Sequence, residues 1–332
     1  MRARSVLLLA PALLMLTQGA LAADFPLRLP LGLQEQAAHI PEDNPLTPEK
    51  IALGKQLFWD KRWSRNGTVA CVSCHDPAHG WADARRVSLR FDGTPTPRHS
   101  PTLVNRLFSD VQQWAGTRRS LEDQAIKASD QSPDLLVKNL GPIAGYQEQF
   151  QKVYGTGVTP GGVAKAIAAY ERTILSGNAP YDRFRAGNQN ALSPPARRGL
   201  ALFEGKAKCV TCHAGFNFTD ESYHNLGVGM DREKPDLGRY TVTKRDEHRG
   251  AFKTPTLRDV VKRPPYMHDG SVTSLAEVVA LYNRGGVPNP WLSGEVRPLG
   301  LSADEQADLL AFMEALTGEV APEVSSPPVL PK

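Results

Sequence analysis

All four cysteines of the chain stand in two short motifs in which a histidine follows the second cysteine. They are Cys71, Cys74 and His75 in the first motif, and Cys209, Cys212 and His213 in the second. In a CxxCH motif the two thiols can bond to the vinyl groups of a haem, and the adjacent imidazole can ligate the iron. Disulfides or a zinc site would use the same residue types, but the distance between the two motifs far exceeds the usual zinc-ribbon spacing. The pattern predicts two covalently bound haems c.

The residues before the two motifs are similar, which predicts a duplicated helical unit. Thr47-Pro48 and Ser193-Pro194 each read as a helix N-cap followed by proline in the first turn. Beyond these starts, a glycine and a Leu-Phe pair recur with the same mutual spacing, as Gly54, Leu57 and Phe58 in one unit and Gly199, Leu202 and Phe203 in the other. We expect two cytochrome c-like lobes, each with one haem.

Other helices are predicted by periodicity and by capping residues. Val163, Ile167, Tyr170 and Ile174 share one helical face, and Ser274 with Glu277 and Ser302 with Glu305 form capping boxes. Strand patterns are scarce, and the chain has 28 glycines and 27 prolines, which favour long ordered loops. The predicted fold is mainly α. Its parts are an N-terminal extension (23–45), two lobes (46–180 and 181–319) and a Pro-rich tail (320–332), which we expect to be extended and partly disordered.

The N-terminus predicts export. Arg2 and Arg4 precede a short apolar stretch, and Ala20-Leu21-Ala22 suits signal peptidase, so residues 1–22 read as a signal peptide. The alternative is a membrane anchor, although the apolar stretch is short for one. A bacterial signal would place the mature chain in the periplasm without a membrane anchor. The formal net charge of +4 is too small and dispersed to indicate nucleic-acid binding.

The chain resembles the bacterial dihaem cytochrome c peroxidases, and within them the MauG-like branch. The resemblance runs from about Leu46 to Gly318. It rests on blocks such as CVSCHDP (71–77), RHSPTLVN (98–105), QQWAGTRRSLEDQA (112–125) and PYMHDGS (265–271). It implies a periplasmic peroxidase that reduces hydrogen peroxide with electrons passed between two haems. A small redox protein, a cytochrome c or a cupredoxin, would donate them. Two alternatives stay open: a MauG-like oxidase acting on a protein substrate, and a dihaem electron carrier without turnover.

The resemblance makes the haem on His75 the peroxidatic one. Several family members place a distal histidine near the position of Pro95, where this chain has none, so an open iron is expected. His79 and His99 are the alternative sixth ligands.

Three residues match the family's catalytic groups. Trp114 matches the tryptophan between the haems, Gln124 a distal glutamine, and Asp134 the position of a catalytic glutamate. A carboxylate near a buried haem can act as an acid/base catalyst. The alternatives are a core tryptophan for Trp114 and an exposed turn residue after Pro133 for Asp134.

The resemblance also proposes a sixth ligand for the haem on His213. Tyr282 stands where the peroxidases have methionine and the MauG-like branch has tyrosine; Met267 and Met230 are its rivals. A phenolate would favour oxidation chemistry over reversible electron carrying.

The family's calcium site between the lobes is left open. His99 replaces its asparagine ligand, and Arg263 supplies one of the matching backbone carbonyls, which argues against calcium. MauG, a member of the branch that this chain resembles, has a surface tryptophan at a position where this chain has Ala207.

Overall fold

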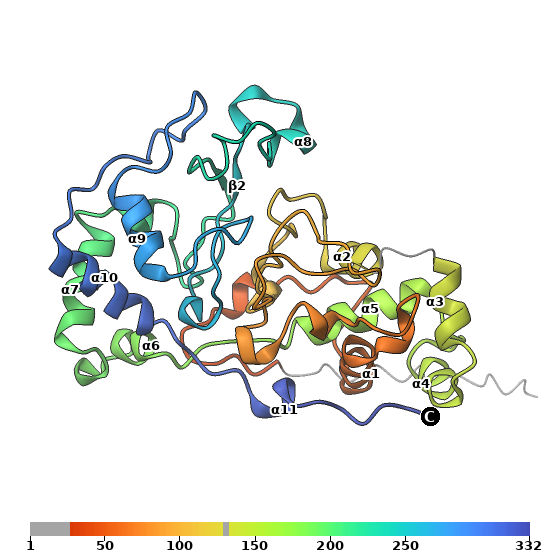
Figure 1. Ribbon diagram of the computed structural model, residues 1–332. Helices are drawn as coiled ribbons and strands as arrows, with labels where there is room; N and C mark the ends of the chain where they lie inside the picture. Colours follow the sequence, from red (N-terminus) through yellow and green to blue (C-terminus); the bar gives the residue numbers. More distant parts are fainter. Residues whose placement is uncertain (1–26, 129–132) are drawn as a thin grey trace, which may run out of the picture.

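The computed structural model describes residues 27–128 and 133–332, so the predicted signal peptide, residues 1–22, lies outside the described residues. Within them the chain is mainly helical and has two lobes (Figure 1). The prediction of a mainly α, two-lobed fold with few strands is confirmed. No helix in these ranges is both long and apolar enough to cross a membrane.

Among the described residues, the N-terminal lobe contains five α-helices and the C-terminal lobe five more, with the last short helix beyond them. The first five are α1 (Pro48–Trp59), α2 (Leu121–Ala128), α3 (Pro133–Leu140), α4 (Ala144–Tyr154) and α5 (Pro160–Glu171). The others are α6 (Pro180–Arg185), α7 (Pro194–Glu204), α8 (Tyr240–Thr243), α9 (Leu275–Asn283), α10 (Ala303–Glu314) and α11 (Pro322–Ser325). Two short strands, β1 (Tyr223–His224) and β2 (Phe252–Lys253), pair antiparallel in the C-terminal lobe.

The helices begin where their capping residues predict. The hydroxyl of Thr47 accepts the Lys50 amide N–H at 3.2 Å, and the hydroxyl of Ser193 caps α7 in the same way. Both capping boxes are formed, at the starts of α9 and α10. These local hydrogen bonds satisfy amides that a helix leaves without intrahelical partners, and therefore fix where each helix starts.

A glycine allows the same close helix crossing in each lobe. In the first lobe α1 crosses α5, and a Cβ on Gly54 would lie 1.8 Å from the Ala166 carbonyl oxygen. In the second, α7 crosses α10, and a Cβ on Gly199 would lie 2.0 Å from the Asp308 carbonyl oxygen. No side chain fits in either place, so the recurrent glycine predicted from the sequence is a packing requirement.

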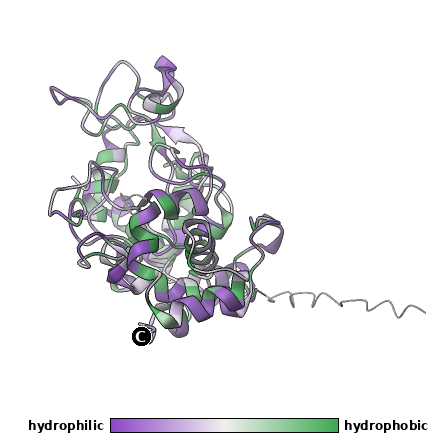
Figure 2. Cartoon of the chain, turned by 90° about the vertical axis from the view of Figure 1, so that its right-hand side faces the viewer, coloured by the Kyte–Doolittle hydropathy of each residue, from purple (hydrophilic) through white to green (hydrophobic). Residues whose placement is uncertain are grey.

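Each lobe has its own hydrophobic core. The rings of Phe58, Trp81 and Tyr170 pack together in edge-to-face or tilted pairs in the first, and those of Phe203, Phe218 and Phe312 do so in the second. Hydrophobic and hydrophilic residues alternate around the helices of the first lobe, which face the viewer in Figure 2. The amphipathic helices thus bury one face against a separate core in each lobe.

A buried ion pair of the second lobe also binds the N-terminal extension. The Arg258 guanidinium, 1% exposed, donates to both carboxylate oxygens of Asp182 at 2.8 and 2.9 Å. It also donates to the backbone carbonyl of Gly32 in the extension. This arginine is fully paired with an anion inside the protein.

The Pro-rich tail is extended, but it packs on the first lobe. After α11 it runs beneath α1 in Figure 1. Val320 and Val324 pack against the core of that lobe, and the Tyr170 hydroxyl donates to the Val324 carbonyl at 2.7 Å. Gln56 donates to the Val329 carbonyl at 3.0 Å. The expectation of a partly disordered tail was therefore wrong, because side chains of α1 and α5 satisfy its backbone.

Candidate haem sites

The first CxxCH motif folds into one turn of 3-10 helix that presents its histidine to the interior. Residues Cys71–Ser73 form the turn, and the His75 amide donates to the Cys71 carbonyl at 3.0 Å. The His75 Nδ1 lies 3.2 Å from the Trp81 carbonyl oxygen and is assigned as the donor, which leaves Nε2 free for a metal. Burial lowers the pKa of His75 to about 4, so the imidazole is neutral at neutral pH, as a ligand must be.

The second motif repeats this geometry. Residues Cys209–Thr211 form the turn, and the His213 amide donates to the Cys209 carbonyl at 2.9 Å. The His213 Nδ1 lies 3.0 Å from the Phe218 carbonyl oxygen. Burial lowers the pKa of His213 to about 4 as well. Two distant segments thus hold a neutral imidazole through its Nδ1 in the same way.

A cavity of about 810 Å³ adjoins the second motif. Cys209, Cys212 and His213 line it from one segment, and Tyr282 lines it from α9. Apolar side chains complete the wall, among them Phe203, Leu257, Val279, Leu309 and Met313. A largely apolar cavity with two thiols and a neutral imidazole at its wall fits a covalently held haem.

Tyr282 and Met267 both reach this cavity. Tyr282 lies near the end of α9, and Leu275 and Val278 line the cavity from the same helix. Burial raises the pKa of Tyr282. Met267 also lines the cavity, whereas the Met230 sulfur lies beside Gly250. The structure therefore brings Tyr282 and His213 to one cavity, and the choice between tyrosine and methionine as the ligand stays a prediction.

Trp114 follows the first CxxCH motif in sequence, yet it lines the cavity of the second. Its indole N–H donates to the His99 carbonyl at 2.8 Å, and its own carbonyl accepts the Lys253 amide at 2.7 Å. These two bonds fix the indole where the lobes meet. The position fits a residue between two haems; the electron-transfer role stays a prediction.

The structure places Gln124 and Asp134 differently from each other. Gln124 lies on α2, and its Oε1 is buried without a hydrogen-bond partner among the described residues. Such an acceptor is available to a donor from outside the chain. Asp134 lies in the first turn of α3 with an exposed side chain. This placement favours the alternative of a solvent-facing residue, and the acid/base role of Asp134 stays a prediction.

The two alternative histidines have other partners. The His79 Nδ1 lies 3.1 Å from an Asp76 carboxylate oxygen in a partly exposed pair. His99 is buried and lines the second cavity, and its Nδ1 lies 3.2 Å from the Arg85 carbonyl oxygen. Arg263 lines the same cavity. A histidine and a guanidinium do not fit calcium, which prefers several oxygen ligands.

A buried ion pair in the second lobe was not predicted from the sequence. Lys253 is 5% exposed, and its Nζ donates to the Glu221 carboxylate at 2.6 Å. Burial lowers the pKa of Lys253 to about 7. A lysine next to a β-strand phenylalanine gives no sequence signal of burial, since lysine is usually exposed.

A buried carboxyl group in the first lobe was also missed. Glu171 ends α5 with 6% exposure, and its Oε2 has no hydrogen-bond partner among the described residues. Burial raises the pKa of Glu171 to about 8. Its place next to Tyr170 on an otherwise apolar helix was the available signal.

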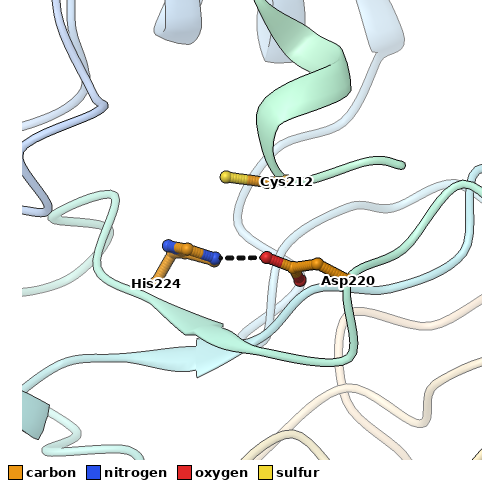
Figure 3. Close-up of side chains that lie close together, drawn as sticks. All are labelled: Cys212, Asp220 and His224. Carbon is orange, nitrogen blue, oxygen red and sulfur yellow. Dashed lines mark hydrogen bonds and ion pairs between the residues drawn. The ribbon is translucent and has the colours of Figure 1, made fainter. Parts of the chain in front are cut away.

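One cysteine, one aspartate and one histidine lie close together at the edge of the second site. The ligand atoms of Cys212, Asp220 and His224 all lie within 4.8 Å of one another, and His224 pairs with Asp220 at 2.8 Å (Figure 3). Because Cys212 belongs to the CxxCH motif, the group is part of the haem site already described.

The fold and the two motifs define a two-lobed helical protein of the dihaem cytochrome class. A family model described as di-haem cytochrome c peroxidase matches residues 48–190. The methylamine utilization protein MauG of Methylorubrum extorquens is 43% identical over 291 residues, which cover 85% of this chain and 82% of that protein. The cytochrome-c peroxidase IdrP1 of Denitromonas iodatirespirans is 39% identical, covering 88% and 87%.

The fold is also similar to that of a solved structure. The crystal structure of a MauG-like protein associated with microbial copper homeostasis aligns with a TM-score of 0.82 and 29% identity, covering 88% of this chain and 96% of that one. The chain belongs to the di-haem cytochrome c peroxidase family and is an oxidoreductase with haem cofactors.

Proposed function

We propose that the chain is a periplasmic peroxidase that binds two haems covalently, one at each CxxCH motif, and reduces hydrogen peroxide. The observation that carries the proposal is the matched geometry of His75 and His213. His213 is buried and His75 is half-buried, and each imidazole is neutral and oriented through Nδ1 by a backbone carbonyl. Such second-sphere bonds orient a histidine for iron. The electron donor would be a small redox protein, a cytochrome c or a cupredoxin.

Reduction of one peroxide to two waters takes two electrons and two protons. Each bound haem would supply one electron through a rise of one in the oxidation state of its iron, so two haems could supply both, whether the protein starts reduced or ferric. Trp114 is the proposed link between them, because it lies in the wall of the second cavity and is fixed by two backbone bonds.

The residues around the first haem would handle the substrate. The free Gln124 Oε1 can accept a hydrogen bond from peroxide or water. The resemblance assigns the proton donor to Asp134, whereas its exposed side chain favours the alternative of a solvent-facing residue. At the second haem, the phenol oxygen of Tyr282 is the proposed sixth ligand.

The test is an electron paramagnetic resonance spectrum of the oxidised protein, followed by turnover with peroxide and reduced cytochrome c. We expect one high-spin haem, a reaction of the ferric protein with peroxide without prior reduction, and two electrons consumed per peroxide. Two low-spin haems and no reaction with peroxide would instead identify an electron carrier.

A second candidate, a MauG-like oxidase of a protein substrate, is favoured by one observation. Tyr282, rather than methionine alone, lines the second cavity, and a phenolate ligand stabilises oxidised iron. Ala207, at the position of the surface tryptophan of MauG, is buried, so that route to a substrate is missing here. Sustained turnover with a small electron donor supports the peroxidase. Peroxide-dependent oxidation of a protein without such turnover would support the oxidase.

A further inference from the structure

Arg263 is a buried cation without an anionic partner. Its side chain is 7% exposed, and one terminal N–H donates to the Thr256 carbonyl. Its Nε has no hydrogen-bond partner among the described residues, and none of their carboxylates lies within ion-pair distance of the guanidinium. The nearby Asp259 pairs with Lys262 at 3.0 Å instead. Within the described part of the chain, Arg263 therefore has a backbone carbonyl as acceptor but no counter-charge.

Arg258, in the same segment, is a buried guanidinium whose anionic partner is a carboxylate of the chain itself. Arg258 is also buried, but both oxygens of Asp182 accept its N–H groups. A buried charge without a counter-charge is strongly unfavourable. The contrast indicates that the anion for Arg263 comes from a bound group.

The surroundings of Arg263 identify where that group lies. Arg263 lines the second cavity together with His213. Burial lowers the pKa of Arg263 only to about 10, so the side chain stays charged at neutral pH. The groups that act on it electrostatically are Tyr266 and Asp259, and its charge in turn lowers the pKa of His99 and His213.

Few anionic side chains line the cavity. Its cationic side chains are Lys206, Lys208, Lys253, Arg263 and Arg297, whereas Glu295 is its one carboxylate among the described residues, and that side chain is exposed. Lys206 and Lys253 are paired with Glu305 and Glu221. Arg263 is therefore the buried cation of this wall that lacks a carboxylate.

We propose that the Arg263 guanidinium pairs with a propionate carboxylate of the haem attached at Cys209 and Cys212. A haem carries two propionates in addition to its vinyl groups, so a haem held by the thiols of this cavity would bring carboxylates into the cavity that Arg263 also lines. The inference rests on the proposed covalent haem at the second motif. Arg263 acts as a positioning residue: it orients the porphyrin and compensates a carboxylate that would otherwise be buried unpaired.

The test compares Arg263→Gln, which removes the charge, with Arg263→Lys, which keeps it. Arg297→Gln is the control, because Arg297 lines the same cavity but is exposed to solvent. Intact mass first establishes that two haems are attached. The reduction potential of the second haem is then measured between pH 5 and 9, and resonance Raman difference spectra report the propionate bending modes.

In Arg263→Gln the uncompensated propionate should stabilise ferric iron. We expect the equilibrium constant for reduction to fall roughly tenfold or more, which is 59 mV for one electron. The potential should also become pH-dependent, since the unpaired carboxylate binds a proton in this range. Arg263→Lys should keep the wild-type potential within about threefold in that constant and shift the propionate mode. Arg297→Gln should change neither.

Three results would overturn the inference. Two haems attached in Arg263→Gln with an unchanged potential and unchanged propionate modes would show that Arg263 does not contact the haem. If Arg263→Gln does not fold, an Arg263→Lys protein with wild-type propionate modes leads to the same conclusion. A wild-type protein with one haem, at the first motif, would overturn the proposed function as well, and intact mass separates that case from the other two.

Discussion

The two lobes hold their CxxCH histidines in the same way but surround them differently. In the first lobe, Gln124 and Glu171 each have a buried oxygen without a hydrogen-bond partner among the described residues, and Glu171 is close enough to Cys71 to act on it electrostatically. Around the second motif lie Tyr282 and the cation Arg263. The duplicated scaffold thus holds the two motifs alike, while side chains that are not duplicated differ around them. This difference supports the proposed division between a substrate site in the first lobe and an electron-holding site in the second.

Removing the thiols of one lobe at a time tests this division most severely. Cys71→Ala with Cys74→Ala, and Cys209→Ala with Cys212→Ala, should each lose one haem, because thioether bonds need both sulfurs in place. Peroxide turnover should be abolished in both variants. Intact mass and an activity assay measure the two effects; a variant that retains two haems would contradict covalent attachment at the altered motif.

The ligand that distinguishes the second lobe can be tested next. Tyr282→Phe should change the spectrum of one haem, since the phenol oxygen is the proposed ligand, while Met267→Leu should leave that spectrum nearly unchanged. Optical and electron paramagnetic resonance spectra of the oxidised variants provide the measurement. The reverse pattern would make the second lobe a methionine-ligated one.

Because the two lobes share the same close helix crossing, substitution of the glycine at either crossing should lower the free energy of unfolding by a similar amount. Gly54→Ala and Gly199→Ala each place a methyl group within 2.0 Å of a backbone oxygen, so each should lower the free energy of unfolding by ~1–3 kcal/mol or more. Gly161→Ala is the control: its Cβ would meet no heavy atom within 4 Å, and it should be neutral or stabilising by up to ~1 kcal/mol. Thermal unfolding compares all three, and a marked asymmetry between the lobes would argue against equivalent crossings.

Glu171 should make the stability of the first lobe depend on pH. Burial raises the pKa of Glu171 to about 8 from the usual 4.5, so the folded state binds the extra proton between these values. Stability contributed by this group is complete below pH 4.5 and falls as the pH rises towards 8. Glu171→Gln should remove that loss, so its melting temperature relative to wild type should be higher at pH 8 than at pH 5. A constant melting difference at both values would show that Glu171 does not titrate in this range.

Substitution of Asp134 should have the smallest effect, and the quantity measured is the rate of peroxide cleavage. A general acid/base group contributes about 10²–10⁴-fold to the rate, and Asp134→Asn would lose that factor if the resemblance assigns its role correctly. Its exposed side chain instead predicts a rate of peroxide cleavage close to wild type. Stopped-flow mixing of the ferric protein with peroxide decides between them, with Lys138→Gln, another exposed residue on α3, as the control.

Sequence alone predicted the features that depend on local pattern. The CxxCH motifs, the capped helix starts and the recurrent glycine are all read from spacing within a few residues, because their physical causes are equally local. Tyr282 was named by its match to a family position, and it does line the second cavity.

Features that depend on tertiary contacts could not be predicted. Lys253 and Arg263 look like ordinary surface residues until distant segments enclose them. The tail looked disordered because its prolines exclude regular structure, and only the α1 and α5 side chains that bind it reveal its order. Asp134 was placed by its match to a family position, which carries no information about exposure.

The return of the tail to the first lobe has a consequence for the packing of that lobe. The last residue, Lys332, accepts a hydrogen bond from the Gly145 amide at 3.1 Å, and the Pro331 carbonyl accepts one from Arg62 at 2.9 Å. Arg62 and Pro331 are 269 positions apart in the sequence, so the second lobe lies between the two partners along the chain. The packing of the first lobe therefore depends on a segment that lies outside the sequence of that lobe.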